Sequence, residues 1–211
     1  MNKSTTEKAY QYIRDGILCG DIPLGSSISE VELSNSISVS RSPVREALRR
    51  LESEGLVKLY PGRGTFVIQI TSQDIREIFE LRLLLESHAL MHSYQHISVE
   101  KLDDLEERIN ALHPDNDSPG EFYGLDRLIH ETLVNHCGNT RLMKMYERLL
   151  LQVALVRRIS GSSPQHFSTS KRYHLLLIHA IRRRDLAAAT QILTEHLNDV
   201  LENTLLVSNY R

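Results

Sequence analysis

Histidine and aspartate side chains in the second half of the sequence have the types and spacing of a divalent-metal site. Asp126 and His130 are four residues apart, which places both side chains on one face of a helix. His174 and His196 belong to two later segments that we expect to form an antiparallel helical hairpin. One carboxylate and three imidazoles suit zinc, nickel or manganese and leave positions open for a ligand. Spacing alone leaves open that these are ordinary core or surface histidines.

A rival set of histidines recurs at every fourth residue near a helix end: His88, His92 and His96. Because we find no acidic residue in line with this set, we expect a solvated stripe on the helix surface. The remaining histidines have no comparable pairing with another candidate: His113, His136, His166 and His179.

Arginines gather on one side of the segment VSRSPVREALRRLESEGLV, residues 39–57. Pro43 is well tolerated in the first turn of a helix and Ser42 is a good N-cap, so we expect a helix that begins at residues 42–43. A stripe of apolar residues at helical spacing must face the core of the domain. It consists of Val44, Ala47, Leu48 and Leu51.

Arg45 and Arg49 lie on a neighbouring face of this helix, with Arg41 just before the helix on the same line, which suits the recognition helix of a helix-turn-helix. Arginine can donate two hydrogen bonds to guanine, and the hydroxyls of Ser40 and Ser42 can reach phosphate oxygens. Arg49 is a candidate for a contact with the DNA backbone.

A plainer interpretation makes the same helix a solvated face with ion pairs four residues apart, such as Glu46 with Arg50. Arg50 is the arginine that this interpretation fits best. The segments on either side of the helix favour DNA binding for the others.

The segment LVKLYPGRGTFVIQI, residues 56–70, has two β-rich runs around the turn-forming PGRG. We expect a hairpin with Arg63 held out between Gly62 and Gly64, as a wing tip that reaches the neighbouring groove or backbone. Three helices precede this hairpin: 6–19, about 29–35, and the arginine helix. The order predicts a winged helix-turn-helix domain over residues 1–70.

From Thr71 onward, long amphipathic patterns replace the strand signals. We expect an all-helical second domain over residues 71–211, with Ser72 as the N-cap of its first helix. The join lacks a Gly/Ser/Pro-rich spacer, so the domains should be closely coupled. The expected helices span roughly 72–95, 98–112, 119–136, 139–160, 166–183 and 185–207. The fold class is therefore mainly α, with a small β-hairpin wing.

The composition is that of a folded globular protein, because 41% of the 211 residues are hydrophobic and the net charge is only −2. The first residues lack the apolar core of a signal peptide, and we find no run long enough for a membrane span. We therefore expect a cytoplasmic protein without a membrane partner. Cys19 and Cys137 are far apart, so we expect two buried thiols and neither a disulfide framework nor a zinc ribbon.

The run VSRSPVREALRRLESEGLV followed by PGRGTFV resembles the signature of GntR-family bacterial transcription regulators, over about residues 6–70. The resemblance implies DNA contacts from the recognition helix and the wing. The implied contact residues are Ser40, Arg41, Ser42, Pro43, Arg45, Gly62 and Arg63. Family members often have a basic residue where this sequence has Val31, so a contact made there by relatives is not implied here.

The run from about Ser72 to Leu206 resembles the FCD domain, the all-helical ligand-binding half named after the fatty-acid regulator FadR. The motifs that carry it are ELRLLLE, LDRLIHETLVNHCGNTRL and YHLLLIHAIRRRDLAAATQILTEHL. The resemblance implies a metal site formed by Asp126, His130, His174 and His196. It also implies that Arg82 contacts the effector, whereas the alternative is a surface ion pair between Arg82 and Glu86. Tyr173 departs from the glutamate that relatives commonly carry.

These observations predict a homodimeric DNA-binding transcription regulator, a repressor rather than an enzyme. It would bind a pseudo-palindromic double-stranded operator. A small carboxylate effector, such as a sugar acid, would bind at the metal site and alter the affinity for DNA. Two alternatives differ in class. One is a metal-dependent hydrolase that uses the Asp126 and histidine cluster, with Glu131 as its base and the N-terminal half as a docking module. The other is a metal-free domain that senses an acyl chain.

Overall fold

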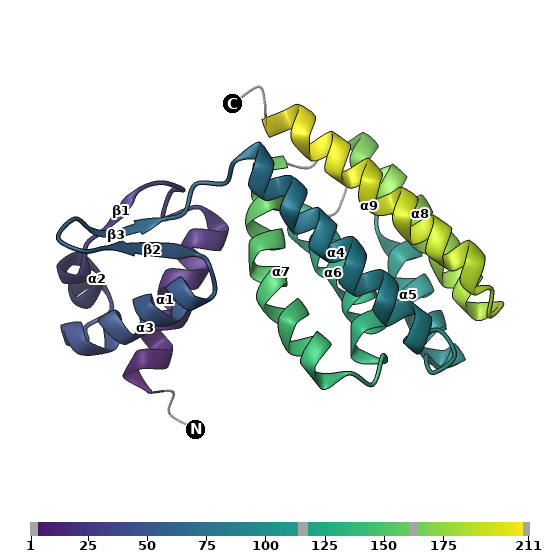
Figure 1. Cartoon of the computed structure of the whole chain (residues 1–211), viewed down its shortest axis with the longest axis horizontal. Helices are drawn as coiled ribbons and strands as arrows, with labels where there is room; N and C mark the ends of the chain where they lie inside the picture. Colours follow the sequence, from purple (N-terminus) through teal and green to yellow (C-terminus); the bar gives the residue numbers. More distant parts are fainter. Residues whose placement is uncertain (1–3, 114–117, 161–163, 209–211) are drawn as a thin grey trace. The chain divides into compact units, whose positions relative to one another are not determined.

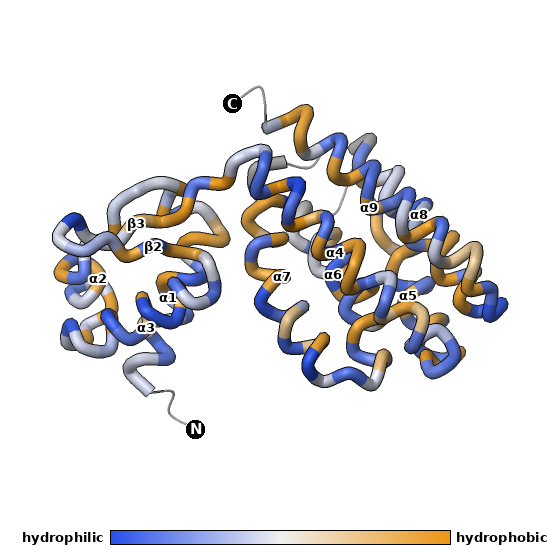
Figure 2. Tube along the Cα trace, in the orientation of Figure 1, coloured by the Kyte–Doolittle hydropathy of each residue, from blue (hydrophilic) through white to orange (hydrophobic). Residues whose placement is uncertain are grey.

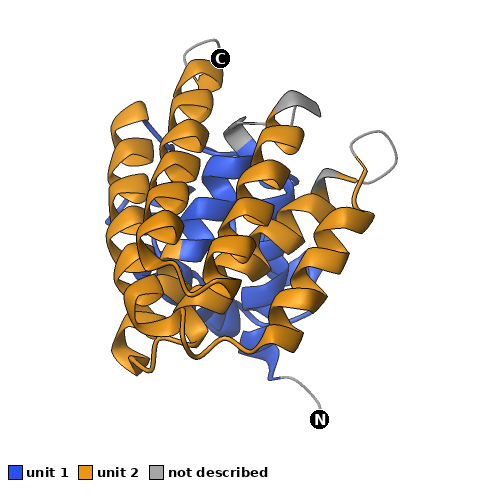
Figure 3. Cartoon of the chain, turned by 90° about the vertical axis from the view of Figure 1, so that its right-hand side faces the viewer, with its two compact units in different colours: residues 1–71, 150–158 blue, residues 72–149, 159–211 orange. Residues whose placement is uncertain are grey.

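The computed structural model describes residues 4–113, 118–160 and 164–208. The chain divides into two compact units, which are coloured separately in Figure 3. One unit comprises Met1–Thr71 with Leu150–Arg158, and the other comprises Ser72–Leu149 with Ile159–Arg211. Figure 1 gives the order of the helices and strands. The predicted fold class, mainly helical with a small wing and a helical C-terminal domain, is confirmed.

The first unit begins with a helix and a short turn that set up the helix-turn-helix. Helix α1 spans Thr5–Cys19, and the Ser4 side chain caps it by accepting a hydrogen bond from the backbone N–H of Glu7. Gly20 ends the helix with φ 103°, a left-handed conformation that glycine adopts without strain. Helices α2 and α3 follow at Glu30–Ser36 and Arg41–Ser53.

Helix α3 begins slightly earlier than the sequence predicted. Its N-cap by backbone conformation is Ser40, and in the described part of the chain the Ser40 side chain makes no capping hydrogen bond. The prediction of Ser42 as the cap is therefore wrong. Pro43 still lies in the first turn, where its missing N–H would have no partner within the helix. A proline tolerated anywhere in that turn locates a helix start only to within a few residues.

The wing is an antiparallel sheet whose described strands are ordered β1-β3-β2. Strands β2 (Val57–Tyr60) and β3 (Gly64–Val67) form the predicted hairpin, with Tyr60 opposite Gly64. In its turn, the Arg63 N–H donates to the Tyr60 carbonyl at 3.0 Å, and Gly62 has φ 72°. Strand β1 (Ser27–Ile28) was not predicted, because two residues are too short to show a strand pattern.

The core of the first unit packs α1 against α3 and the sheet. The apolar stripe of α3 is buried as predicted, which leaves the opposite face of the helix to its arginines: the stripe consists of Val44, Ala47, Leu48 and Leu51.

The burial of the two cysteines differs from the prediction. Cys19 is exposed and Cys137 is half-buried, so the prediction of two buried thiols is wrong.

The second unit is made of long amphipathic helices, along which hydrophobic and hydrophilic positions alternate (Figure 2). In the described residues these are α4 (Ser72–Ser93), α5 (Val99–Ala111), α6 (Pro119–Asn135), α7 (Thr140–Ser160), α8 (Pro164–Arg182) and α9 (Leu186–Ser208), except that the Leu150–Arg158 part of α7 belongs to the first unit. Ser72 is the first residue of α4, not its predicted cap, a difference within the uncertainty of helix ends. Among the described residues, no helix is long and apolar enough to cross a membrane.

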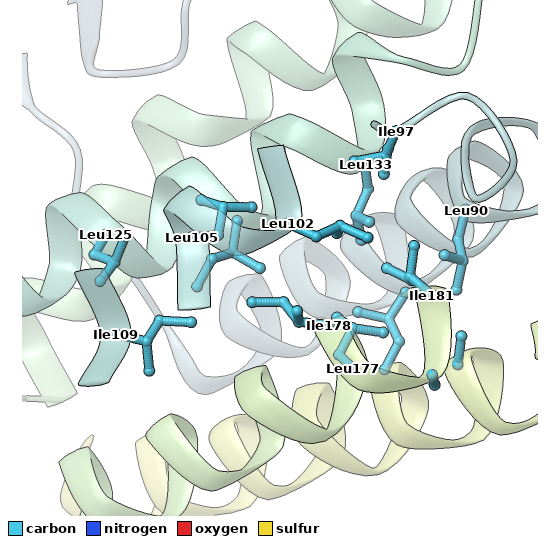
Figure 4. Packing of buried hydrophobic residues seen from close by; sticks show 14 of the residues in the cluster. Leu90, Ile97, Leu102, Leu105, Ile109, Leu125, Leu133, Leu177, Ile178 and Ile181 are labelled. Atoms are coloured by element: carbon cyan, nitrogen blue, oxygen red, sulfur yellow. The ribbon is translucent and has the colours of Figure 1, made fainter. Parts of the chain in front are cut away.

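A hydrophobic cluster joins α4, α5, α6, α8 and α9 and determines which faces of these helices turn inward. Figure 4 shows Leu102 and Leu105 of α5 packed near Leu177 and Ile178 of α8. On α6 the cluster takes every fourth residue: Leu125, Ile129 and Leu133. Asp126 directly follows Leu125, and His130 directly follows Ile129. Both polar residues are buried beside this apolar stripe.

Candidate functional site

Four side chains from three helices meet inside the second unit. Asp126 and His130 lie one turn apart on α6, His174 lies on α8 and His196 on α9. All four are buried, and one possible ligand atom from each lies within 4.8 Å of the others. The structure therefore brings together the four residues whose spacing suggested a metal site.

The distances between these donor atoms test whether they fit a metal ion. Asp126 Oδ1 lies 3.2 Å from His174 Nε2, 3.8 Å from His130 Nε2 and 3.9 Å from His196 Nε2. The Nε2 atoms of His130 and His196 are 3.3 Å apart. Donors about 2.0–2.1 Å from a tetrahedral zinc ion would be about 3.3 Å from each other. The donor set therefore fits a divalent ion in both chemistry and size.

The position of His196 in the site follows from the amphipathic pattern of α9. Ala189, Leu193, His196, Leu197 and Val200 form its buried stripe, so His196 occupies a position that an apolar residue would otherwise fill. Burial lowers the pKa of His196 well below its ordinary value, and the neighbouring imidazoles of His174 and His130 act in the same direction. A neutral imidazole is the form that binds a metal ion.

Glu86 of α4 adds a fifth polar residue, whose place in the site was not predicted from the sequence. Its Oε2 lies 2.5 Å from His130 Nδ1, and its side chain is fully buried. Burial by itself would raise the pKa of this carboxyl. Its close contacts with the Arg82 guanidinium and with His130 outweigh burial and hold the pKa of Glu86 far below its usual range. Glu86 is therefore ionised and accepts a hydrogen bond from His130 Nδ1–H.

Arg82 pairs with Glu86, but not on the surface as the alternative interpretation had it. Its Nε donates to Glu86 Oε1 at 2.8 Å, and only 2% of the Arg82 side chain is exposed. The hydroxyl of Tyr146, from α7, donates to the same oxygen at 2.8 Å. Glu86 thus accepts from three buried side chains that belong to three helices.

The sequence pattern of α4 contains a signal that indicates a buried, paired Glu86. Arg82 and Glu86 occupy successive positions of its buried stripe, between Phe79 and Ala89. Charged residues at core positions of an amphipathic helix are usually paired. Tyr146 gave no such signal, because its role depends on tertiary contacts alone.

The other histidines stay apart from this cluster. His88, His92 and His96 are exposed, as expected of a solvated stripe. The ring centroids of His88 and His92 are 4.7 Å apart, with the ring planes tilted by 50°. His179 Nε2 lies 2.7 Å from Glu106 Oε1, a partner that was not predicted. Tyr173, which stands where relatives commonly have glutamate, lies beside the cluster with its ring 5.5 Å from that of His196.

The arginines of α3 separate into two groups. Arg41, Arg45 and Arg49 are exposed, as are Ser40, Ser42, Gly62 and Arg63, whereas Pro43 is half-buried. Arg45 and Arg49 line a pocket of about 240 Å³ together with Glu30, Leu48 and Leu59. Val31 on α2 is exposed as well, with a relative accessibility of 45%.

Arg50 belongs to the structural group, although its predicted partner is wrong. Its guanidinium lies 3.6 Å from the centre of the Tyr10 ring and pairs with Glu7 at 2.9 Å and Glu54 at 3.1 Å. Glu46 instead accepts a hydrogen bond from the Thr6 hydroxyl at 2.8 Å. Both Glu46 and Glu54 lie four residues from Arg50, and the packing of α1 against α3 decides between them.

Comparisons with known proteins cover both units. Residues 5–67 match the bacterial regulatory proteins of the gntR family, and residues 77–199 match the FCD domain. The gluconate operon transcriptional repressor of Bacillus subtilis (strain 168) is 30% identical over 212 aligned residues, which cover 95% of this chain and 85% of the relative.

Solved structures agree with this assignment. E. coli McbR/YncC has the same fold, with a TM-score of 0.82 at 19% identity over 100% of both chains. The Zn2+-bound FCD domain of TM0439, a putative transcriptional regulator, is 25% identical with a TM-score of 0.58, over 65% of this chain and 95% of that one. The chain therefore belongs to the GntR family, carries an FCD domain over residues 77–199 and is a DNA-binding transcription regulator.

Proposed function

We propose that this regulator acts as a homodimer that binds a pseudo-palindromic operator through two winged helix-turn-helix domains, each formed by residues 1–70. Helix α3 enters the major groove and the wing contacts the neighbouring groove or backbone. The exposed positions on α3 and the wing support this placement. The contact residues are Ser40, Arg41, Ser42, Pro43, Arg45, Arg49, Gly62 and Arg63. Arg50 is left out because Tyr10 and two glutamates hold its guanidinium.

The second domain, residues 71–211, forms the dimer and binds a divalent metal ion through Asp126, His130, His174 and His196. The convergence of these four buried donors is the observation that carries the proposal. Zinc is our first candidate, because the similar FCD domain of TM0439 is a Zn2+-bound protein. Nickel and manganese can use the same donors. A bound ion would act as a Lewis acid that attracts an anionic ligand.

The charges around the site favour a carboxylate as the effector. With both carboxyls ionised and the imidazoles neutral, Asp126 and Glu86 carry two negative charges against the one positive charge of Arg82, so the cluster without metal is negative. A divalent ion reverses that sign. An organic acid, such as a sugar acid, then meets open metal positions and the nearby guanidinium of Arg82. Its binding depends on the metal.

We propose that the carboxylate controls repression. A ligand that prefers one arrangement of the dimer shifts the population of molecules able to bind DNA. The relative in Bacillus subtilis is named as a repressor of a gluconate operon, which supports both the sign of regulation and the class of effector. We place the protein in the cytoplasm, where its operator is accessible.

The hydrolase alternative has no support. The matching families and relatives are transcription regulators. Glu131, its candidate base, is occupied elsewhere, since its carboxylate accepts from Arg127 at 2.8 Å on the outer face of α6.

A combined experiment tests the proposal. Protein purified without a histidine tag should contain about one divalent ion per chain by elemental analysis. Fluorescence anisotropy with DNA from the region upstream of its own gene should then show binding that a sugar acid or another carboxylate changes only in the metal-loaded form. Protein that stays empty after zinc, nickel and manganese are supplied would refute the metal site. A carboxylate response equal with and without metal would refute the role of the ion.

A further inference from the structure

The two oxygens of the Glu86 carboxylate contact different partners. Oε1 accepts from Arg82 Nε and from the Tyr146 hydroxyl, both at 2.8 Å. Oε2 lies 2.5 Å from His130 Nδ1. All four side chains are buried, so exposed water does not compete for these hydrogen bonds.

Two donors at Oε1 and a planar carboxyl group fix the direction of Oε2. The buried guanidinium of Arg82, 2.8 Å from Oε1, needs a counter-charge, which the carboxylate form of Glu86 supplies. A carboxylate only accepts hydrogen bonds, so His130 must carry its proton on Nδ1. That tautomer leaves the Nε2 lone pair of His130 facing His196 Nε2 at 3.3 Å and Asp126 Oδ1 at 3.8 Å. Within the described residues, His196 Nδ1 has no such partner.

We propose that Glu86 is the positioning residue of the metal centre: it fixes the tautomer and ring direction of His130, and Arg82 and Tyr146 hold it in place. This inference rests on the proposed metal site and adds a residue to it. A carboxylate that accepts from the second nitrogen of a metal-binding histidine makes that histidine a better ligand. Arg82 thereby serves the metal site through Glu86.

The variant Glu86→Gln gives a specific prediction. Arg82 and Tyr146 both donate, so the amide should turn its oxygen toward them and its NH2 group toward His130. His130 Nδ1 must then accept, which moves the ring proton to Nε2, the nitrogen that faces the other donors. Zinc affinity of the full-length protein, measured by competition with a chelator, should fall about 10- to 100-fold.

Glu131→Gln is the matched control. It removes the same charge next to His130 in the sequence, but from a glutamate that pairs with Arg127 on the exposed side of α6. We expect zinc affinity within about threefold of wild type. An equal loss in both variants would mean that charge, not the direction of the hydrogen bond, is responsible, and would overturn the proposal.

Nitrogen-15 NMR of the metal-free protein reads the tautomer directly. His130, assigned through a His130→Gln variant, should be protonated on Nδ1 in wild type and on Nε2 in Glu86→Gln. The wild-type spectrum is decisive even if Glu86→Gln does not fold, because protonation on Nε2 there contradicts the proposal. A Glu86→Gln protein that melts earlier but binds zinc as wild type does would give Glu86 a purely structural role and overturn the inference alone. Wild type that takes up no zinc overturns the proposed metal site, and this inference with it.

Discussion

Arg45 Nε lies 2.7 Å from Glu30 Oε2, so an ion pair joins α3 to α2 at the face where α3 would read DNA. Both side chains are partly exposed, with 57% and 28% of their side-chain surface accessible. Such a pair contributes little to stability, so the guanidinium can exchange the glutamate for a base or phosphate at low cost. Glu30 also limits where Arg45 points before DNA arrives.

Replacement of Arg45 by Ala should weaken operator binding by about 1 to 3 kcal/mol, because a two-hydrogen-bond contact with a base is lost. Fluorescence anisotropy at one fixed salt concentration measures the change. Stability should be nearly unaffected, since the side chain lies outside the core. Operator affinity equal to wild type at matched salt would remove Arg45 from the contact residues.

Replacement of Glu30 by Gln should act in the opposite direction. Without the carboxylate, Arg45 is free and one negative charge no longer repels the phosphates. We expect affinity for operator and for unrelated DNA to rise severalfold, with the larger gain for unrelated DNA because Arg45 is less restrained. A drop in affinity for both would show that Glu30 does not compete with DNA for this arginine.

Arg50 should matter for stability and not for DNA. Arg50→Ala loses the contact with the Tyr10 ring and two exposed ion pairs, together about 1 kcal/mol. Denaturant unfolding measures this cost, and Arg49→Ala is the control with similar exposure. We expect Arg50→Ala to keep its preference for operator over unrelated DNA, while Arg49→Ala loses general affinity and keeps its stability. If Arg50→Ala lost DNA affinity and Arg49→Ala lost stability, Arg49 would be the structural residue and Arg50 the DNA contact.

Local patterns predicted most of the fold because the helices are long and strongly amphipathic. The expected start and end of α5, α6 and α9 lie within two residues of the observed ones. What could not be predicted depends on contacts between elements. Strand β1 forms only because it pairs with β3. Arg50 pairs with Glu54 and not with Glu46, because its guanidinium lies over the ring of Tyr10 on α1.

The candidate site shows the same division. Asp126 and His130 share a helix, so their spacing carries information, and the hairpin of α8 and α9 aligned His174 with His196. Glu86 reaches His130 across 44 positions of sequence, and Tyr146 reaches Glu86 across 60. No periodicity links residues on different helices, so only the packed structure reveals that these side chains meet.

Removal of two histidines from the cluster should abolish metal binding. The double variant His174→Ala, His196→Ala keeps Asp126 and His130 but leaves too few donors to hold zinc, so elemental analysis should find less than about a tenth of the wild-type metal. The matched control is His88→Ala, His92→Ala, which deletes two histidines that are exposed on α4. If both double variants lose metal equally, the ion is bound at the surface and not in the cluster.

The metal should decide which small molecules stabilise the protein. Without it, Asp126 and Glu86 outweigh Arg82, and an added carboxylate meets a negative, buried site. With it, the site is positive, and a carboxylate can satisfy both the ion and the guanidinium. A thermal-shift screen of sugar acids and dicarboxylates should therefore give hits only with metal present, and neutral sugars of the same size should give none. A bound ligand at a hundred times its dissociation constant contributes about 2.7 kcal/mol, which is several degrees for a domain of this size. Carboxylates that raise the melting temperature of the His174→Ala, His196→Ala protein as much as that of wild type would place the effector away from the metal.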